Sequence, residues 1–156
     1  MSRSRLISLL IGGLGLAACS ERVIVRAASD VLVTIEEIKP GDPFATAQVR
    51  YLFAKPMPLA EGDPSLVARM SYDAVFDCAR KTWGHRSQAL TLADGRSVSQ
   101  TYVQPDMDAP TPGSLGDSIV QGVCDPTVRK RRASRRPQAS LERDYLETMG
   151  SGVIRR

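Results

Sequence analysis

The chain has 156 residues, of which 42% are hydrophobic and 24% are charged, and its formal net charge is +4. This length fits one domain, and this composition excludes both a polytopic membrane protein and a wholly disordered chain. One histidine and three cysteines are too few ligands for most metal and cofactor chemistry, so we expect neither a metal nor a cofactor.

The first residues have the layout of a secretory signal peptide. Arg3 and Arg5 form a short cationic region, and residues 6–16 form an uncharged apolar run, which is too short to cross a bilayer as a helix. The run ends in Leu16-Ala17-Ala18-Cys19, which resembles the lipobox of bacterial lipoproteins. The alternative is an ordinary cleavage site of small residues, at which Cys19 is incidental.

The lipobox implies a lipid anchor at Cys19. Residues 1–18 would be removed, diacylglycerol would be joined to the Cys19 sulfur, and the new amino terminus would be acylated, for example with palmitate. Ser20 rather than Asp follows the cysteine, which by resemblance to lipoprotein sorting favours the outer membrane. We therefore expect an outer-membrane lipoprotein held by its acyl chains, which lies either on the periplasmic face or on the cell surface.

Alternation of apolar and polar residues dominates the region after the anchor and predicts β-strands. Strands are expected over residues 22–26, 31–38, 45–53, 66–78, 87–92 and 97–103. Alternation places Tyr51 and Phe53 on one face of the strand over residues 45–53, and Leu66 and Met70 on the core face of the strand over residues 66–78. The length of this last strand predicts a bulge or break near Arg69. Asp94-Gly95 suits a tight hairpin between the last two strands. The proline-rich stretches 40–43 and 56–64 predict loops.

One helix is expected over residues 114–124. Ser114 is a good N-cap, and Asp117 follows three residues later, where its charge favours the positive end of a helix. Leu115, Ile119 and Val123 form an apolar stripe, and Pro126 ends the helix. We therefore predict an α+β fold in which an antiparallel sheet of about five or six strands is covered by one packed helix.

Cys78 and Cys124 are the two cysteines left once Cys19 is acylated, so they predict a single disulfide in an oxidising compartment. The alternating pattern points Cys78 into the core. The alternatives are reactive thiols or a two-cysteine metal site, although the chain has no Cys-x-x-Cys motif.

Charge divides the chain after the signal peptide into an acidic domain (residues 19–128) and a basic tail (residues 129–156). The domain has 10 Lys and Arg against 14 Asp and Glu, a net charge of −4, and the tail has 9 against 3, a net charge of +6. The tail is expected to be largely disordered, with a short helix over residues 140–149. Its cationic block forms a candidate polyanion-binding site of Arg129, Lys130, Arg131, Arg132, Arg135 and Arg136.

The cationic block has three possible roles: it binds lipopolysaccharide phosphates, it binds an acidic macromolecule, or it has no specific partner. We expect no nucleic-acid partner, because an exported chain leaves the cytosol.

The stretch from residue 72 to residue 124 is similar to the surface-adhesin protein E-like family of bacterial lipoproteins. The residues that carry the resemblance are Phe76-Asp77-Cys78, Arg80-Lys81-Thr82-Trp83, Asp94-Gly95, Pro112-Gly113-Ser114 and Val123-Cys124. The resemblance implies an antiparallel sheet with a packed helix, held by the Cys78–Cys124 bridge. It also implies a surface adhesin that binds host proteins, or an envelope protein with another role. The chain departs from the family at Met107, where a tryptophan is common, and in its additional basic tail.

Catalytic groups are scarce. His85 is the only histidine, and no Gly-x-Ser-x-Gly motif supports a Ser-His-Asp set, so we expect an exposed strand or turn histidine and no enzyme. Asp106 and Asp108 offer two carboxylates, which is too few for a calcium site and fits a solvated loop. Trp83 and Tyr102 are read as core or hairpin packing, with a ligand platform as the alternative.

These patterns together predict a non-catalytic binding or adhesin-like lipoprotein of the bacterial envelope, whose partner is a host or envelope macromolecule. The alternative is a periplasm-facing structural lipoprotein that holds envelope polyanions through its basic tail.

Overall fold

The computed structural model describes residues 21–150, so the signal peptide and Cys19 lie outside the described residues. The strands of the described chain are β1 (Arg22–Ala27), β2 (Val31–Lys39), β3 (Phe44–Pro58), β4 (Leu66–Asp77), β5 (Thr82–Leu92), β6 (Ser97–Thr101) and β7 (Ala133–Ser134). The helices are α1 (Leu115–Cys124), α2 (Pro126–Arg132) and α3 (Gln138–Gly150). No helix among these is long and apolar enough to cross a membrane.

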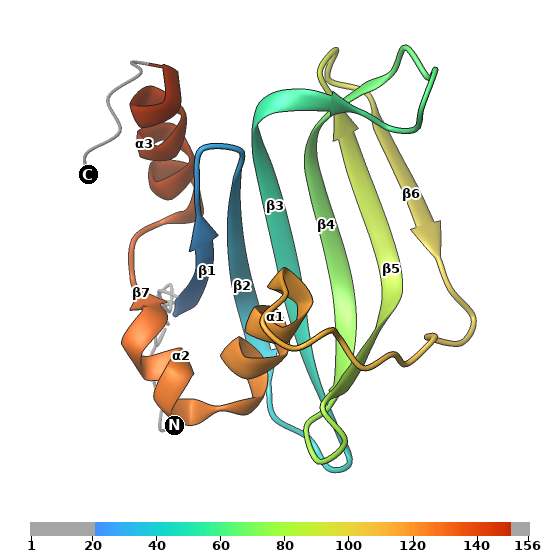
Figure 1. Cartoon of the computed structure of the whole chain (residues 1–156), viewed down its shortest axis with the longest axis vertical. Coiled ribbons are helices and arrows are strands. Elements are labelled where there is room, and N and C mark those ends of the chain that lie inside the picture. The colour runs from blue at the N-terminus through green and yellow to red at the C-terminus, as the bar shows by residue number, and fades with distance from the viewer. Residues whose placement is uncertain (1–20, 151–156) are drawn as a thin grey trace, which may run out of the picture.

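The seven strands form one antiparallel sheet in the order β6-β5-β4-β3-β2-β1-β7 (Figure 1). An antiparallel sheet covered by a helix and closed by a disulfide is as predicted. The count differs, however, because the described chain has seven strands and three helices where five or six strands and one helix were expected.

The expected irregularity near Arg69 is confirmed, because the register between β4 and β5 shifts between Val67 and Arg69. The loop expected over residues 56–64 begins later than predicted. β3 continues to Pro58 because its pairing with β4 resumes at Met57↔Val67 after a second register shift.

α1 packs on one face of the sheet, which we call the α1 face. Ser114 caps the helix as predicted, since its Oγ accepts a hydrogen bond from the Asp117 backbone N–H at 3.2 Å. Gly122 lets the helix approach closely, because a Cβ there would lie 2.9 Å from Ile35 Cδ1. The main core is composed of buried aliphatic and aromatic side chains from the sheet and α1: Val23, Val33, Ile35, Val49, Phe76, Ile119, Val120 and Val123.

The predicted disulfide between Cys78 and Cys124 is confirmed. The two Cα atoms lie 5.3 Å apart, within the usual range for a disulfide. The bond joins the residue after β4 to the last residue of α1, and therefore holds the helix across the sheet.

The segment after residue 128 differs from the expected disordered tail, because its described part, residues 129–150, folds onto the sheet. Val128 in α2 is buried, and β7 pairs with β1. The short helix expected over residues 140–149 is present as the longer α3. Leu141 and Tyr145 of α3 pack against Leu32 and Leu52, which alternate with the α1-face residues and so lie on the opposite face. These apolar contacts offset the repulsion within the cationic block.

Candidate ligand-binding groove

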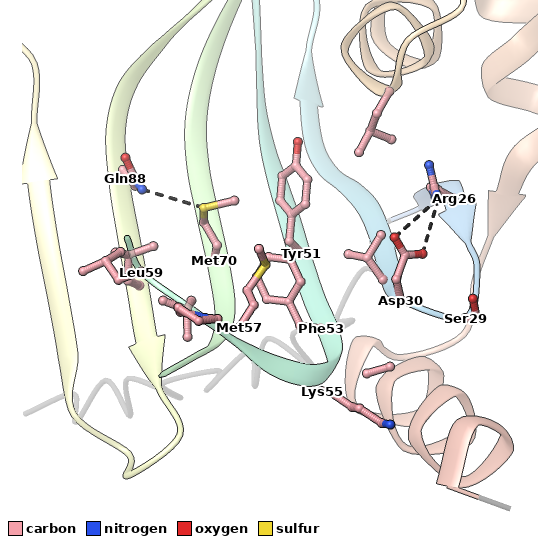
Figure 2. Close-up of a pocket in the computed structure, with 16 residues that line it drawn as sticks. Arg26, Ser29, Asp30, Tyr51, Phe53, Lys55, Met57, Leu59, Met70 and Gln88 are labelled. Atoms are coloured by element: carbon pink, nitrogen blue, oxygen red, sulfur yellow. Dashed lines mark hydrogen bonds and ion pairs between the residues drawn. The ribbon is translucent and has the colours of Figure 1, made fainter. Parts of the chain in front are cut away.

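α1 covers only part of its face, and the uncovered part forms a groove of about 810 Å³ (Figure 2). The groove lies over β3, β4 and β5, between α1 and the end of β3. Its lining is mostly apolar: Val31, Tyr51, Phe53, Ala54, Met57, Pro58, Leu59, Val67, Met70, Leu90 and Leu115, with Arg26, Ser29, Asp30, Lys55 and Gln88 as the polar members.

The floor of the groove follows from strand register. Tyr51 pairs with Met70 and Met70 pairs with Leu90, so the three side chains form one row across β3, β4 and β5 on the α1 face. The alternating pattern predicted that face for Tyr51, Phe53 and Met70.

The register shift near Arg69 corrects one part of that pattern. Leu66 was expected on the core face, but it is 42% exposed, whereas Val67 is buried and lines the groove. One extra residue in a strand exchanges the two faces beyond the bulge, and the alternation by itself does not locate that residue.

The rim of the groove is apolar and exposed. Met57 and Leu59, which lie at and just beyond the end of β3, are 47% and 46% exposed, and Figure 2 shows Met57 beside Phe53 and Leu59 on the side of Gln88. Val98 on β6 pairs with Leu90, so it extends the row of the floor, and it is 53% exposed. Adjacent exposed apolar side chains of this kind are typical of interaction sites.

Few polar groups enter the groove. Burial, and then the neighbouring Tyr72, raises the pKa of the Tyr51 hydroxyl far above its ordinary value, so this group stays neutral. At one side Arg26 pairs with Asp30 at 3.3 Å. Gln88 is held by the Tyr102 hydroxyl, which donates to its Oε1 at 3.1 Å. The groove therefore favours an uncharged, largely apolar ligand.

His85 lies beside the groove in an aromatic cluster. Its ring stacks on Tyr72 with centroids 4.1 Å apart and meets the edge of Trp83 at 4.8 Å. Its Nε2 is buried with no hydrogen-bond partner in the described chain, and burial lowers the pKa of the imidazole. The histidine is thus half-buried in β5 rather than exposed, because the β5 strand begins at Thr82 and not at the expected residue 87.

The other residues singled out in the sequence occupy packing positions. Trp83 stacks near Phe76, with centroids 5.8 Å apart, and packs against the main core. Asp108 pairs with Trp83 through backbone hydrogen bonds. No group of three His, Cys, Asp or Glu side chains that could hold a metal ion occurs among the described residues.

Four residues of the cationic block lie in α2, and the other two, Arg135 and Arg136, directly follow β7. Arg129 donates to the Val123 carbonyl oxygen at 2.5 Å, and Arg136 pairs with Asp144. The other four, Lys130, Arg131, Arg132 and Arg135, form no ion pair with any residue that the structure describes. The structure thus brings the block together on one edge of the sheet, apart from the floor of the groove.

No protein-family model, no curated protein and no solved structure matches the chain. The resemblance to the surface-adhesin protein E-like family therefore stays a prediction. Sequence reasoning did not identify the groove, although the apolar residues Met57 and Leu59 among prolines were an available signal.

Proposed function

We propose that the chain is a lipid-anchored lipoprotein of the bacterial outer membrane that acts as a non-catalytic, adhesin-like binding module, with the groove as its ligand site. The observation that supports the groove is its size and lining. Its volume of about 810 Å³ falls within the range of roughly 300–1,000 Å³ that is typical of ligand sites.

The partner we propose is an apolar, extended segment of a host or envelope protein. The half-exposed Met57 and Leu59 favour a macromolecule over a small enclosed ligand. β6 is an edge strand of the sheet, and an edge strand offers backbone N–H and C=O groups for an added strand. Val98 on β6 pairs with Leu90 on β5, so an apolar side chain of that segment opposite Val98 would continue the apolar row that leads into the groove.

Phage-displayed short peptides, selected on the purified full chain, test this proposal. The double variant Met57→Glu and Leu59→Glu places charges on the rim, where both side chains are already solvated. Val103→Glu is the matched control, because Val103 is fully exposed and does not line the groove. We expect selected peptides to lose at least tenfold in affinity with the rim variant and to keep their affinity for the control, since unpaired charges oppose apolar contact. Peptides that bind the rim variant unchanged would contradict the groove as the ligand site.

The anchor is tested separately by the intact mass of the protein extracted from bacterial membranes. The proposal predicts a chain that begins at Cys19 and carries diacylglycerol and an N-terminal acyl group. A chain with an unmodified Cys19 would contradict the lipid anchor and leave the groove proposal standing.

A second candidate function is a structural lipoprotein that holds envelope polyanions. The observation in its favour is that Lys130, Arg131 and Arg135 are exposed and form no ion pair in the described chain. Binding of this kind would weaken steeply with salt. Equal binding of lipopolysaccharide at low and high salt would contradict it.

A further inference from the structure

β7 pairs with the start of β1, so the cationic block on either side of β7 lies close to the first residues of the described chain. Arg22 pairs with Ser134 and Val23 with Ala133 in the β1–β7 ladder. The Arg22 guanidinium also donates from Nη1 to the Arg136 carbonyl oxygen at 3.1 Å. The start of β1, α2 and β7 therefore lie together at one edge of the sheet (Figure 1).

This edge is also close to the proposed anchor. Cys19 stands three positions before Arg22 in the sequence, and a stretch of three residues spans at most about 11 Å. A Cys19 whose acyl chains are in the bilayer would consequently hold the β1–β7 edge near the lipid headgroups.

Three exposed side chains contribute positive charge to this edge, and we call them the anchor-edge cations: Lys130, Arg131 and Arg135. Residues 126–136 contain no Asp or Glu. Arg131 influences one acid, Asp125, whose pKa is lowered chiefly by the backbone N–H groups of Val128 and Thr127 and to a smaller extent by Arg131. Asp125 is the N-cap of α2, and as a single carboxylate beside three exposed cations it leaves the edge with a net positive charge.

We propose that the anchor-edge cations dock on the anionic headgroups of the same membrane leaflet that holds the acyl chains of Cys19. This inference rests on the proposed lipid anchor. Guanidinium and ammonium groups form charge-assisted hydrogen bonds with phosphate oxygens. Each basic residue near an anionic surface shifts the docked-to-free ratio by about fivefold.

A membrane is favoured over a soluble polyanion because the anchor supplies proximity. A tethered domain meets its own bilayer at a high effective concentration, whereas a soluble partner must be supplied from solution. The headgroups also lie within reach of every anchored copy.

Docking at this edge orients the groove. The sheet order places β7 and β1 at one edge and β5 and β6 toward the other, and the floor of the groove lies on β3, β4 and β5. The start of β1, which pairs with β7, is thus separate from the floor of the groove, whereas Arg26 near the other end of β1 lines one side of the groove. Docking through the start of β1 leaves β6 at the far edge of the sheet.

The experiment uses the full acylated protein reconstituted into vesicles. One set of vesicles is phosphatidylcholine alone, and the other contains about a third phosphatidylglycerol. Amide hydrogen exchange of residues 126–136 is measured by mass spectrometry in both. The test variant is Lys130→Gln, Arg131→Gln and Arg135→Gln. The matched control removes three exposed cations on the β5–β6 side: Lys81→Gln, Arg86→Gln and Arg96→Gln.

The proposal predicts slower exchange of this segment in the anionic vesicles than in the neutral ones. In 1 M salt the Debye length falls to about 3 Å, so the difference should disappear. The test variant should lower the docked-to-free ratio by about 100-fold and lose the protection, while the control keeps it. Because each protein is compared with itself in two lipids, a change in folding does not mimic the effect.

Equal exchange in neutral and anionic vesicles, for an acylated and inserted protein, would overturn the proposal. Protection by a soluble polyanion such as heparin or an oligonucleotide, without protection by anionic vesicles, would also overturn it and would assign the cations to another partner. Failure to insert, with an unmodified Cys19, is a different result that refutes the proposed anchor.

Discussion

Leu141→Ala tests whether α3 is an integral part of the domain. Leu141 is buried against Leu32 and Leu52 on the face opposite α1. A buried leucine truncated to alanine typically costs about 2–5 kcal/mol. Because only Leu141 and Tyr145 of α3 are buried, the cluster is small, and we expect about 2–3 kcal/mol, the lower part of that range.

Leu146→Ala is the matched control, because it makes the same truncation in the same helix at a residue that is 38% exposed. We expect it to change the free energy of unfolding by less than about 0.5 kcal/mol. The assay is urea denaturation followed by far-UV circular dichroism, with the slope compared between variants so that a change in the exposed surface is detected. Equal losses from the two variants would refute the docking of α3 and restore the disordered tail that the sequence predicts.

Three further predictions concern the main core and its neighbours. Replacing Cys78 and Cys124 by serine should cost about 4 kcal/mol, because the disulfide closes a loop with a sequence separation of 46; a reduced wild type as stable as the oxidised one would contradict this. Burial lowers the pKa of the His85 imidazole in the folded protein. The stability that the neutral imidazole contributes is therefore fully present above pH 6.5, the pKa of histidine in the unfolded chain, and is lost as the pH falls toward the lower pKa of the folded state. Thermal melts between pH 7.5 and pH 5 should therefore fall more in the wild type than in His85→Gln, and parallel curves would show that the histidine is not the cause. Ser114→Ala removes the hydroxyl that caps α1 by accepting from the Asp117 N–H, and it should lower the free energy of unfolding in urea by about 1 kcal/mol. An unchanged free energy of unfolding would mean that another group caps the helix.

The features that local rules govern were predictable. Ser114 and Asp117 marked the start of α1, and alternation placed Tyr51, Phe53 and Met70 on one face. The cysteine count indicated a single pair, which the structure has. Each of these depends on residues that are near in sequence, or on a count, and not on a choice among long-range partners.

The alternating pattern does not indicate that the C-terminal segment packs on the sheet, but a run of consecutive apolar residues in β2 does. Val31, Leu32 and Val33 are consecutive and all buried, which indicates a strand covered on both faces. A second covering element was therefore needed, and Leu141 and Tyr145 supply it. The run of cations before them has the composition of a disordered tail. The composition of the segment therefore indicated disorder, whereas the buried residues of β2 indicated that another element covers them.

The groove was not predictable for a different reason. It exists because α1 is only 10 residues long and leaves the far ends of β3, β4 and β5 uncovered. The sequence gives the length of the helix, but the part of the sheet that it covers is set by the three-dimensional position of the Cys78–Cys124 bridge and of Gly122 against Ile35.

The role of the groove is tested most directly by mapping a selected peptide onto the full chain by NMR. Binding in the groove should concentrate the chemical-shift changes at Phe53, Met70 and Leu90 and at the rim residues Met57 and Leu59. A map centred on α3, or on the β1–β7 edge, with the groove unshifted, would contradict the central claim that this face of the sheet is the binding site.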